Sequence, residues 1–97
     1  MIKNRTNDIQ EEKGRISSSN YSDYYSTFDL GVAAALVSNN FSLFSLEKSN
    51  PKKVQFIFIR EADIEKIVHD YFSDQLKINA RTLFDNTKML KNRIYSE

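Results

Sequence analysis

The stretch VQFIFIREADIEKIVHDYF, residues 54–72, holds the two patterns that decide the fold. Its first seven residues predict a β-strand, because β-branched and aromatic residues dominate there. The apolar side chains divide between two faces, with Val54, Phe56 and Phe58 on one and Ile57 and Ile59 on the other. Apolar residues on both faces are typical of a central strand, so we expect this strand to be covered on both sides.

The second half of the stretch predicts an amphipathic helix from Glu61 to about Leu76. Its apolar residues follow the i, i+3, i+4, i+7, i+8 spacing of one helix face: Ile64, Ile67, Val68, Tyr71 and Phe72. Five carboxylates lie on or near the same helix: Glu61, Asp63, Glu65, Asp70 and Asp74. We interpret them as a solvated face that complements the helix dipole in the first turn. A magnesium site completed by Asp23 or Asp29 is the minor alternative.

Residues 23–53 predict two more strands with a short helix between them. Residues 23–28 are aromatic and Thr-rich, as in a short strand. Residues 29–38 predict a helix capped by Thr27 or Asp29, in which Gly31 indicates a close approach. Its buried face is expected to hold Leu30, Ala33, Ala34 and Val37.

Asn39-Asn40 predicts a left-handed stop to that helix, because Asn tolerates positive φ. Residues 41–47 then predict the second strand, whose alternation breaks at Leu43-Phe44. Such a break indicates a bulge or an edge strand. Residues 48–53, with the sequence KSNPKK, predict the turn that leads into the central strand.

Residues 80–95 predict a final helix that Asn79 caps. Its expected buried stripe is Ala80, Leu83, Phe84, Thr87, Leu90 and Ile94.

The element order predicts an α+β fold, with a single small domain over residues 23–97 and the topology βαββαα. We expect a three-stranded, mostly antiparallel sheet in the order 2-3-1, because the third strand has a central character and a right-handed crossover fits. Residues 1–22 are polar and predict a mobile N-terminal arm, or alternatively an arm that orders on a partner. The sheet edges leave room for a homodimer.

Composition narrows the classes of function. The 97 residues include no Cys, one His and two Gly, which excludes thiolate and multi-histidine metal sites and glycine-rich phosphate loops. His69 lies beside an apolar stripe without a nucleophile pattern around it. We therefore expect a protein that is not an enzyme and binds no cofactor or metal. The absence of a long apolar run predicts a cytoplasmic protein without a membrane partner.

The final helix is the best candidate for a binding surface. At 100° per residue, Arg81, Lys88 and Lys91 fall on one flank of this helix, with Phe84 and Tyr95 between them. Cations interleaved with aromatic residues bind phosphates and stack on bases. The hairpin lysines would extend the patch if they share its side: Lys48, Lys52 and Lys53. Alternatively, the two aromatic residues belong to the core and the cations only keep the surface solvated.

The sheet offers a second surface. Five aromatic residues in or near the first two strands could form an exposed platform for single strands or for a protein: Tyr21, Tyr24, Tyr25, Phe41 and Phe44.

Four short motifs occur in a characteristic order along the chain. The first comprises Thr27, Asp29, Leu30, Ala33, Ala34 and Leu36; the others are Phe56 with Phe58, Ile67 with Tyr71, and Leu90, Lys91, Ile94 and Tyr95. In this order and spacing the chain resembles a small family of domains of unknown function from bacteria, archaea and phages. Asn39-Asn40 stands where members often have a glycine turn. The resemblance covers about residues 24–95 and implies the βαββαα fold and a microbial or mobile-element setting, but no activity.

Two hypotheses of function follow. The first is a non-enzymatic accessory protein that binds DNA or RNA through Arg81, Lys88, Lys91, Lys52 and Lys53. The alternative is a protein-interaction module, such as a phage- or plasmid-encoded regulator or inhibitor of a host protein, which acts by docking or self-association.

Overall fold

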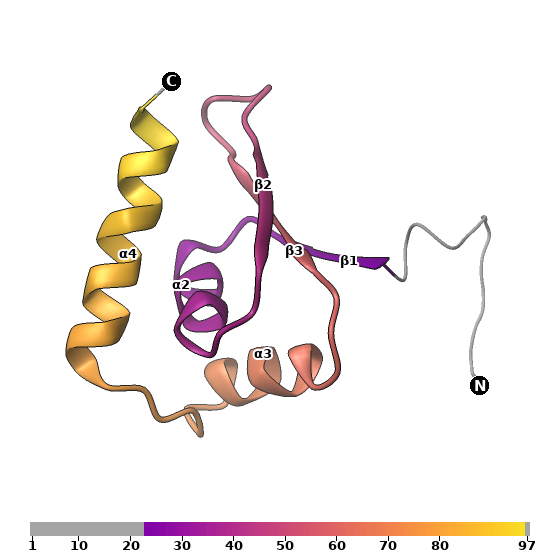
Figure 1. The fold of residues 1–97 in the computed structure, drawn as a ribbon, viewed down its shortest axis with the longest axis vertical. Helices are drawn as coiled ribbons and strands as arrows, with labels where there is room; N and C mark the ends of the chain where they lie inside the picture. The colour runs from indigo at the N-terminus through magenta and orange to yellow at the C-terminus, as the bar shows by residue number, and fades with distance from the viewer. Residues whose placement is uncertain (1–22, 97) are drawn as a thin grey trace.

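The computed structural model describes residues 23–96, so the predicted arm at residues 1–22 lies outside the described part of the chain. The described elements follow the predicted βαββαα order (Figure 1). They are β1 (Tyr24–Thr27), α2 (Leu30–Ser38), β2 (Leu43–Glu47), β3 (Gln55–Ile59), α3 (Ile64–Phe72) and α4 (Ala80–Tyr95).

The three strands form an antiparallel sheet in the order β1-β3-β2, which confirms the predicted central place of the third strand. In β1, Tyr24 pairs with Ile59 and Thr27 pairs with Phe56. The pairing of β2 with β3 shifts register between Leu43 and Ser45, as the break in alternation predicted.

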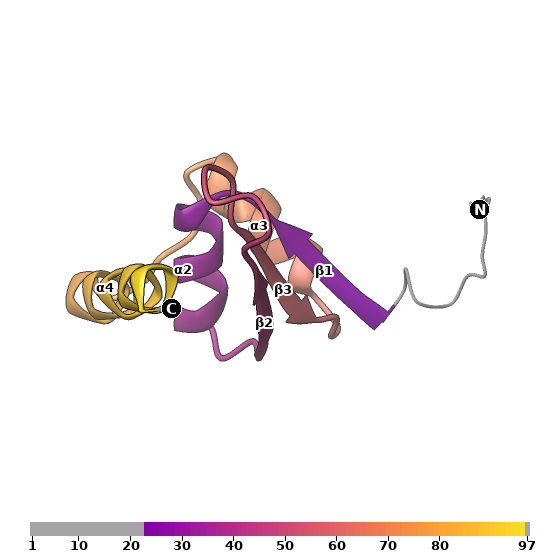
Figure 2. The same ribbon diagram turned by 90° about the horizontal axis from the view of Figure 1, so that it is seen from above.

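The described helices lie on one side of this sheet. Viewed from above, α4, α2 and the sheet follow one another in layers, and α3 lies at one end of the stack (Figure 2). Five consecutive residues of α2 are buried, Val32–Leu36, because neighbours cover this helix on every side. The structure thus corrects the prediction of a single buried face on α2.

The prediction that β3 is covered on both faces is also wrong. Phe56 and Phe58 are buried against the helices, whereas Ile59, on the other face, is 37% exposed. The side chains of Ile57 and Ile59 lie outside the core cluster to which all described helices contribute. The element covered on both sides is therefore α2 rather than β3.

Local capping explains where α2 begins and ends. The Oδ1 atom of Asp29 accepts a hydrogen bond from the backbone N–H of Val32 at 3.0 Å, which makes Asp29 the N-cap. Asn40 has a φ of 69° and ends the turn that follows the helix, as predicted. A Cβ atom on Gly31 would collide with the hydroxyl of Tyr71, so this glycine allows α3 to approach α2 closely.

Helix α3 is shorter than predicted, since it begins at Ile64 and ends at Phe72. Asp63 and Asp74 both have positive φ, at 71° and 63°, and this backbone conformation cannot continue a right-handed helix. Glu65 is the acidic residue in the first turn of α3, whereas Glu61 lies before the helix begins. The prediction that Glu61 belongs to the first turn is therefore wrong.

Helix α4 has the predicted bounds, and Asn79 occupies its N-cap position without a side-chain capping bond. Leu90 is fully buried and belongs to the same core cluster as the buried residues of α2. The Nδ2 atom of Asn86 donates to the hydroxyl oxygen of Ser38 at 2.9 Å and links the two helices. Ala80 and Phe84 are exposed, in contrast to the predicted buried stripe, because α4 lies at the outside of the stack.

Candidate nucleic-acid interface

The exposed side of α4 carries five residues in one row, which we call the basic–aromatic row: Arg81, Phe84, Lys88, Lys91 and Tyr95. The residues follow one another at alternating intervals of three and four, which keeps side chains on one side of an α-helix. The row extends over four turns, or roughly 21 Å at 1.5 Å per residue. A single rigid element therefore positions all five side chains.

The two aromatic side chains of the row are in solvent. Phe84 is 61% exposed and Tyr95 is 81% exposed. This result rules out the alternative that both belong to the core. Aromatic rings of this size are normally covered, and exposed examples beside cations are the groups on which bases stack in single-strand binding proteins.

The cations of the row have only weak partners. The Nζ atom of Lys88 lies 5.0 Å from the centre of the Phe84 ring. The Nε atom of Arg81 lies 3.7 Å from Oδ2 of Asp85, one helical turn away, in an exposed ion pair. Exposed pairs of this kind contribute about 0.2–1 kcal/mol, so an incoming phosphate can displace the carboxylate.

The hairpin lysines divide between two regions. The Nζ atom of Lys48 donates to the carbonyl oxygens of Arg93 and Ile94 at 3.0 and 3.2 Å, and so binds the C-terminal end of α4. The Nζ atom of Lys53 lies 5.0 Å from the centre of the Phe28 ring, next to the end of β1. Lys52 is exposed in the turn. The structure thus groups Arg81, Lys88 and Lys91, and places Lys53 with the sheet.

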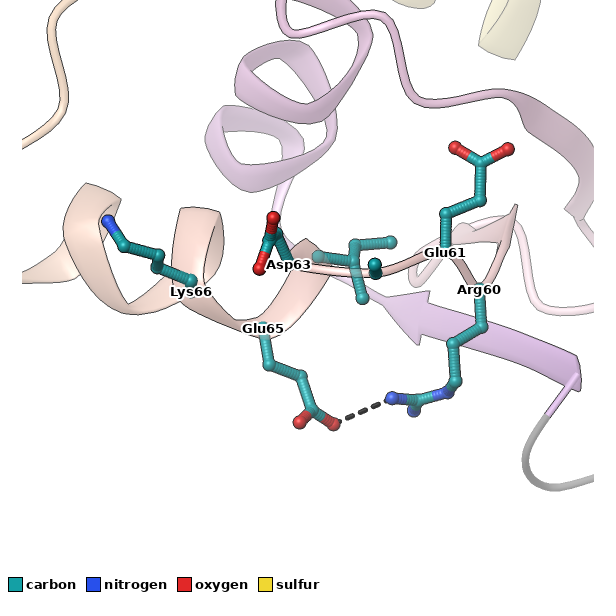
Figure 3. A pocket seen from close by; sticks show the side chains of 7 residues that line it. Arg60, Glu61, Asp63, Glu65 and Lys66 are labelled. Carbon is teal, nitrogen blue, oxygen red and sulfur yellow. Dashed lines mark hydrogen bonds and ion pairs between the residues drawn. The ribbon is translucent and has the colours of Figure 1, made fainter.

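The carboxylates of the α3 region are solvated or paired with cations. The Nη1 atom of Arg60 lies 2.7 Å from Oε2 of Glu65, at the edge of an open hollow that residues 60–66 line (Figure 3). Asp63 is exposed at the same hollow. No group of three metal-ligating side chains occurs within residues 23–96. The predicted magnesium alternative therefore gains no support from the geometry.

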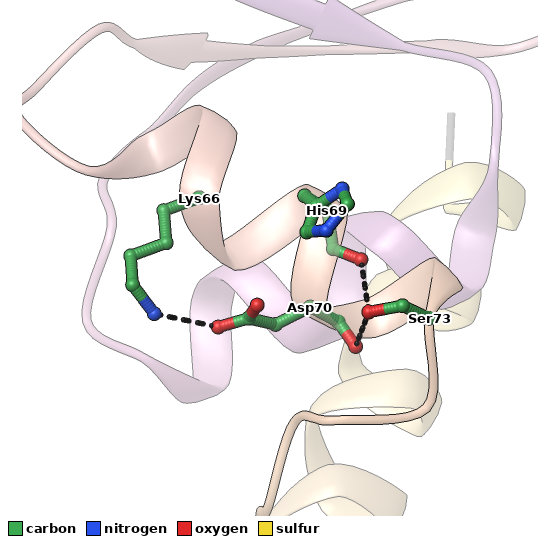
Figure 4. A network of polar contacts seen from close by, with 4 residues as sticks. All are labelled: Lys66, His69, Asp70 and Ser73. Atoms are coloured by element: carbon green, nitrogen blue, oxygen red, sulfur yellow. Dashed lines mark hydrogen bonds and ion pairs between the residues drawn. The ribbon is translucent and has the colours of Figure 1, made fainter.

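The polar side of α3 is a local network of ordinary helix contacts (Figure 4). The Nζ atom of Lys66 donates to Oδ2 of Asp70 at 2.9 Å, and the hydroxyl of Ser73 donates to the carbonyl oxygen of His69 at 2.9 Å. The imidazole of His69 is exposed beside this network. These contacts stabilise the last turn of the helix.

Among the described residues, two side chains have a pKa that is clearly shifted from its ordinary value. The hydrogen bond to Asp70 raises the pKa of Lys66. Burial, and then the nearby Glu65 carboxylate, raise the pKa of Tyr25, while Arg60 acts in the opposite direction. Both changes move the pKa further above neutral pH, so neither prepares its group for proton transfer there.

Over residues 23–96, the fold and this surface define a small α+β domain with three helices on one side of a three-stranded antiparallel sheet. Residues 22–96 match the family described as Domain of unknown function (DUF5659), and the chain belongs to that family. Searches of curated proteins and of solved structures found no match. Within the described residues, no helix is long and apolar enough to cross a membrane.

Sequence reasoning missed the role of Lys48, which the hairpin brings to the end of α4 across 45 residues of chain. Lysine near a helix C-terminus is a familiar signal, but only when both lie close in sequence. The aromatic platform predicted for the sheet is confirmed in part. The rings of Tyr24 and Phe44 are exposed and meet with their centres 5.0 Å apart. Tyr25 and Phe41 instead pack against the core cluster, and Tyr21 lies outside the described residues.

Proposed function

We propose that the protein binds nucleic acid through the basic–aromatic row of α4 and has no catalytic role. The observation that carries this proposal is the exposure of Phe84 and Tyr95 between the cations of one helix face. Arg81, Lys88 and Lys91 would contact phosphates, and the two rings would stack on bases. Because stacking needs bases that are free of a duplex, we propose a single strand as the preferred ligand.

The charge of α4 supports this assignment. Ala80–Tyr95 contains four cationic side chains and one carboxylate, whereas the rest of the chain has 10 cationic side chains and 12 carboxylates and is net negative. With three phosphate contacts on a single strand, the logarithm of the binding constant should fall with that of the salt concentration at a slope of about −2. A rise from 50 to 200 mM salt would then weaken binding about 20-fold.

The test measures fluorescence anisotropy of a labelled single-stranded oligonucleotide at several salt concentrations. The double variant Arg81→Glu with Lys88→Glu should weaken binding at least tenfold and bring the salt slope to about −0.7, because one phosphate contact remains. The matched control, Lys77→Glu with Arg93→Glu, makes the same change in net charge at two exposed residues outside the row.

The control should retain most of the affinity. Equal losses in both double variants would show that binding depends on net charge alone and would contradict the assignment to the row. Phe84→Ala with Tyr95→Ala separates stacking from charge, since it should lower the affinity and leave the salt slope unchanged.

A protein-interaction module is the second candidate, and a different surface favours it. The sheet face with Tyr24, Phe44 and Ile59 is apolar and exposed, as in a protein interface. A regulator or inhibitor of a host protein would dock through such a surface. Binding of that kind would survive nuclease treatment and would be insensitive to Arg81→Glu with Lys88→Glu.

A further inference from the structure

The face of the sheet that points away from the helices exposes apolar side chains, and we call it the open sheet face. Strand register puts Tyr24, Ile57 and Ile59 on it, the ring contact with Tyr24 adds Phe44, and alternation after Thr27 adds Phe28; all five lie outside the core cluster. The register also puts three polar side chains on this face: Ser26, Ser45 and Gln55. Phe44 is 56% exposed, and its ring meets the ring of Tyr24 with their centres 5.0 Å apart. Because β1 and β2 flank β3, these two rings meet across the central strand.

The hairpin end of the open sheet face carries two opposite charges. Glu47 pairs in register with Gln55, so its side chain lies on the same face of the sheet as Ile57 and Ile59. Lys53 lies over the ring of Phe28, next to the end of β1. An anionic side chain thus lies on the β2 side of β3, and a cationic one lies on the β1 side.

This arrangement is complementary to itself. A two-fold axis parallel to β3 would exchange the β1 side and the β2 side of two facing sheets. Lys53 would then lie opposite the partner's Glu47, twice by symmetry, and Tyr24 would lie opposite the partner's Phe44. The apolar residues of both copies would fill the space between these contacts, as in aligned sheet packing.

We propose that the open sheet face binds a second copy of this chain, in an isologous dimer with Lys53 of each protomer paired to Glu47 of the other. The contact uses the face of the sheet, not its edge, and it leaves the basic–aromatic row of α4 in solvent on both copies. The dimer would therefore present two such rows.

The size of the face sets the strength of the dimer. Three strands of up to five residues give a footprint of roughly 17 by 14 Å. This footprint is well below the surface of about 800 Å² that each partner buries in a standard interface. We therefore expect a weak dimer, with a Kd of about 10–100 μM.

Sedimentation velocity of the full chain over a range of concentrations tests this proposal. Lys53→Glu and Glu47→Lys should each weaken the dimer about tenfold, because each places two pairs of like charges in contact. An equimolar mixture of the two variants should recover a dimer close to the original strength, since both pairs of the mixed dimer join opposite charges. Both residues are exposed, and Glu47→Lys removes a single long hydrogen bond that Oε1 accepts from the backbone N–H of Ser49 at 3.3 Å, so the fold should stay intact.

Ile59→Lys should abolish the dimer, because it puts a charge on the central strand, beside the ring of Tyr24, where the two faces would meet. Phe72→Lys is the control, since Phe72 is an exposed apolar residue of α3 outside this face. The proposal would be overturned if the chain stayed monomeric up to about 1 mM, some tenfold above the weakest expected Kd. The open sheet face would then be a binding surface for residues 1–22 or for another protein. The same conclusion follows if the mixed charge variants do not associate.

Discussion

Helices α2 and α4 pack against each other, yet neighbouring elements cover them to very different extents. The sheet, α3 and α4 surround α2, whereas α4 contacts the rest of the described domain mainly through α2. Leu30–Ser38 contains no charged residue, and Ala80–Tyr95 contains five. Of these two helices, α4 is therefore the one with a side on which charged and aromatic groups can meet a ligand.

The difference shows how a domain of this size keeps one helix surface uncovered and available for binding. Three consecutive alanines bring the backbone of α2 close to its neighbours on several sides, so this helix fills the interior with little side-chain volume. The outer helix then needs one buried stripe to stay attached. Its remaining surface is under no packing constraint, and substitutions there should affect binding more than stability.

The largest effect on stability is expected where α4 contacts α2. Leu90→Ala removes a fully buried side chain and should lower the free energy of unfolding by about 2–5 kcal/mol. Phe84→Ala, on the exposed side of the same helix, should change it by less than about 0.5 kcal/mol. Urea denaturation followed by circular dichroism measures both. A similar loss for Phe84→Ala would mean that its ring is covered in solution.

A smaller loss is expected when α2 is enlarged. Ala34 is completely buried, so Ala34→Leu overpacks the middle layer and should cost about 1–3 kcal/mol. Ala80→Leu adds the same atoms to the exposed first turn of α4 and should stay within about 0.5 kcal/mol of the original chain. Thermal unfolding of the two variants compares them directly, and equal melting temperatures would contradict the covered position of α2.

The smallest effect is expected at the link between the hairpin and α4. Lys48→Met keeps the aliphatic stem but removes the donor to the carbonyl oxygens of Arg93 and Ile94, at a cost of about 0.5–1.5 kcal/mol. Lys52→Met changes an exposed lysine of the same hairpin and should be neutral. Hydrogen exchange at the last turn of α4 should rise only in the Lys48 variant; an unchanged rate would show that this contact does not hold the helix end.

Much of the fold could be predicted because local signals agree with the tertiary arrangement. The break at Leu43-Phe44 marked the bulge, Asp29 marked the start of α2, and Asn40 marked its end. The antiparallel order of the strands followed from the apolar character of β3. Helix α3 was predicted too long, because the unfavourable positive φ of Asp63 and Asp74 leaves no clear trace in the periodicity.

The candidate site was predicted in part. The wheel of α4 placed Arg81, Lys88 and Lys91 on one side, but it could not decide whether Phe84 was inside or outside. Helical periodicity defines which residues share a side, and only the neighbours of a helix define how wide its covered side is. The position of Lys53 beside Phe28 likewise depends on how the hairpin packs against β1.

The sequence alone determined the order of the elements, the antiparallel sheet and the residues that share one side of α4, because periodicity and capping act over a few residues. Only the tertiary structure decided that α2, and not β3, is the element covered on both sides. All three helices of the described residues lie on one side of the sheet, and this arrangement depends on contacts between residues distant in the chain. It leaves Ile59 and Phe44 exposed on one side of the molecule and Phe84 and Tyr95 exposed on another.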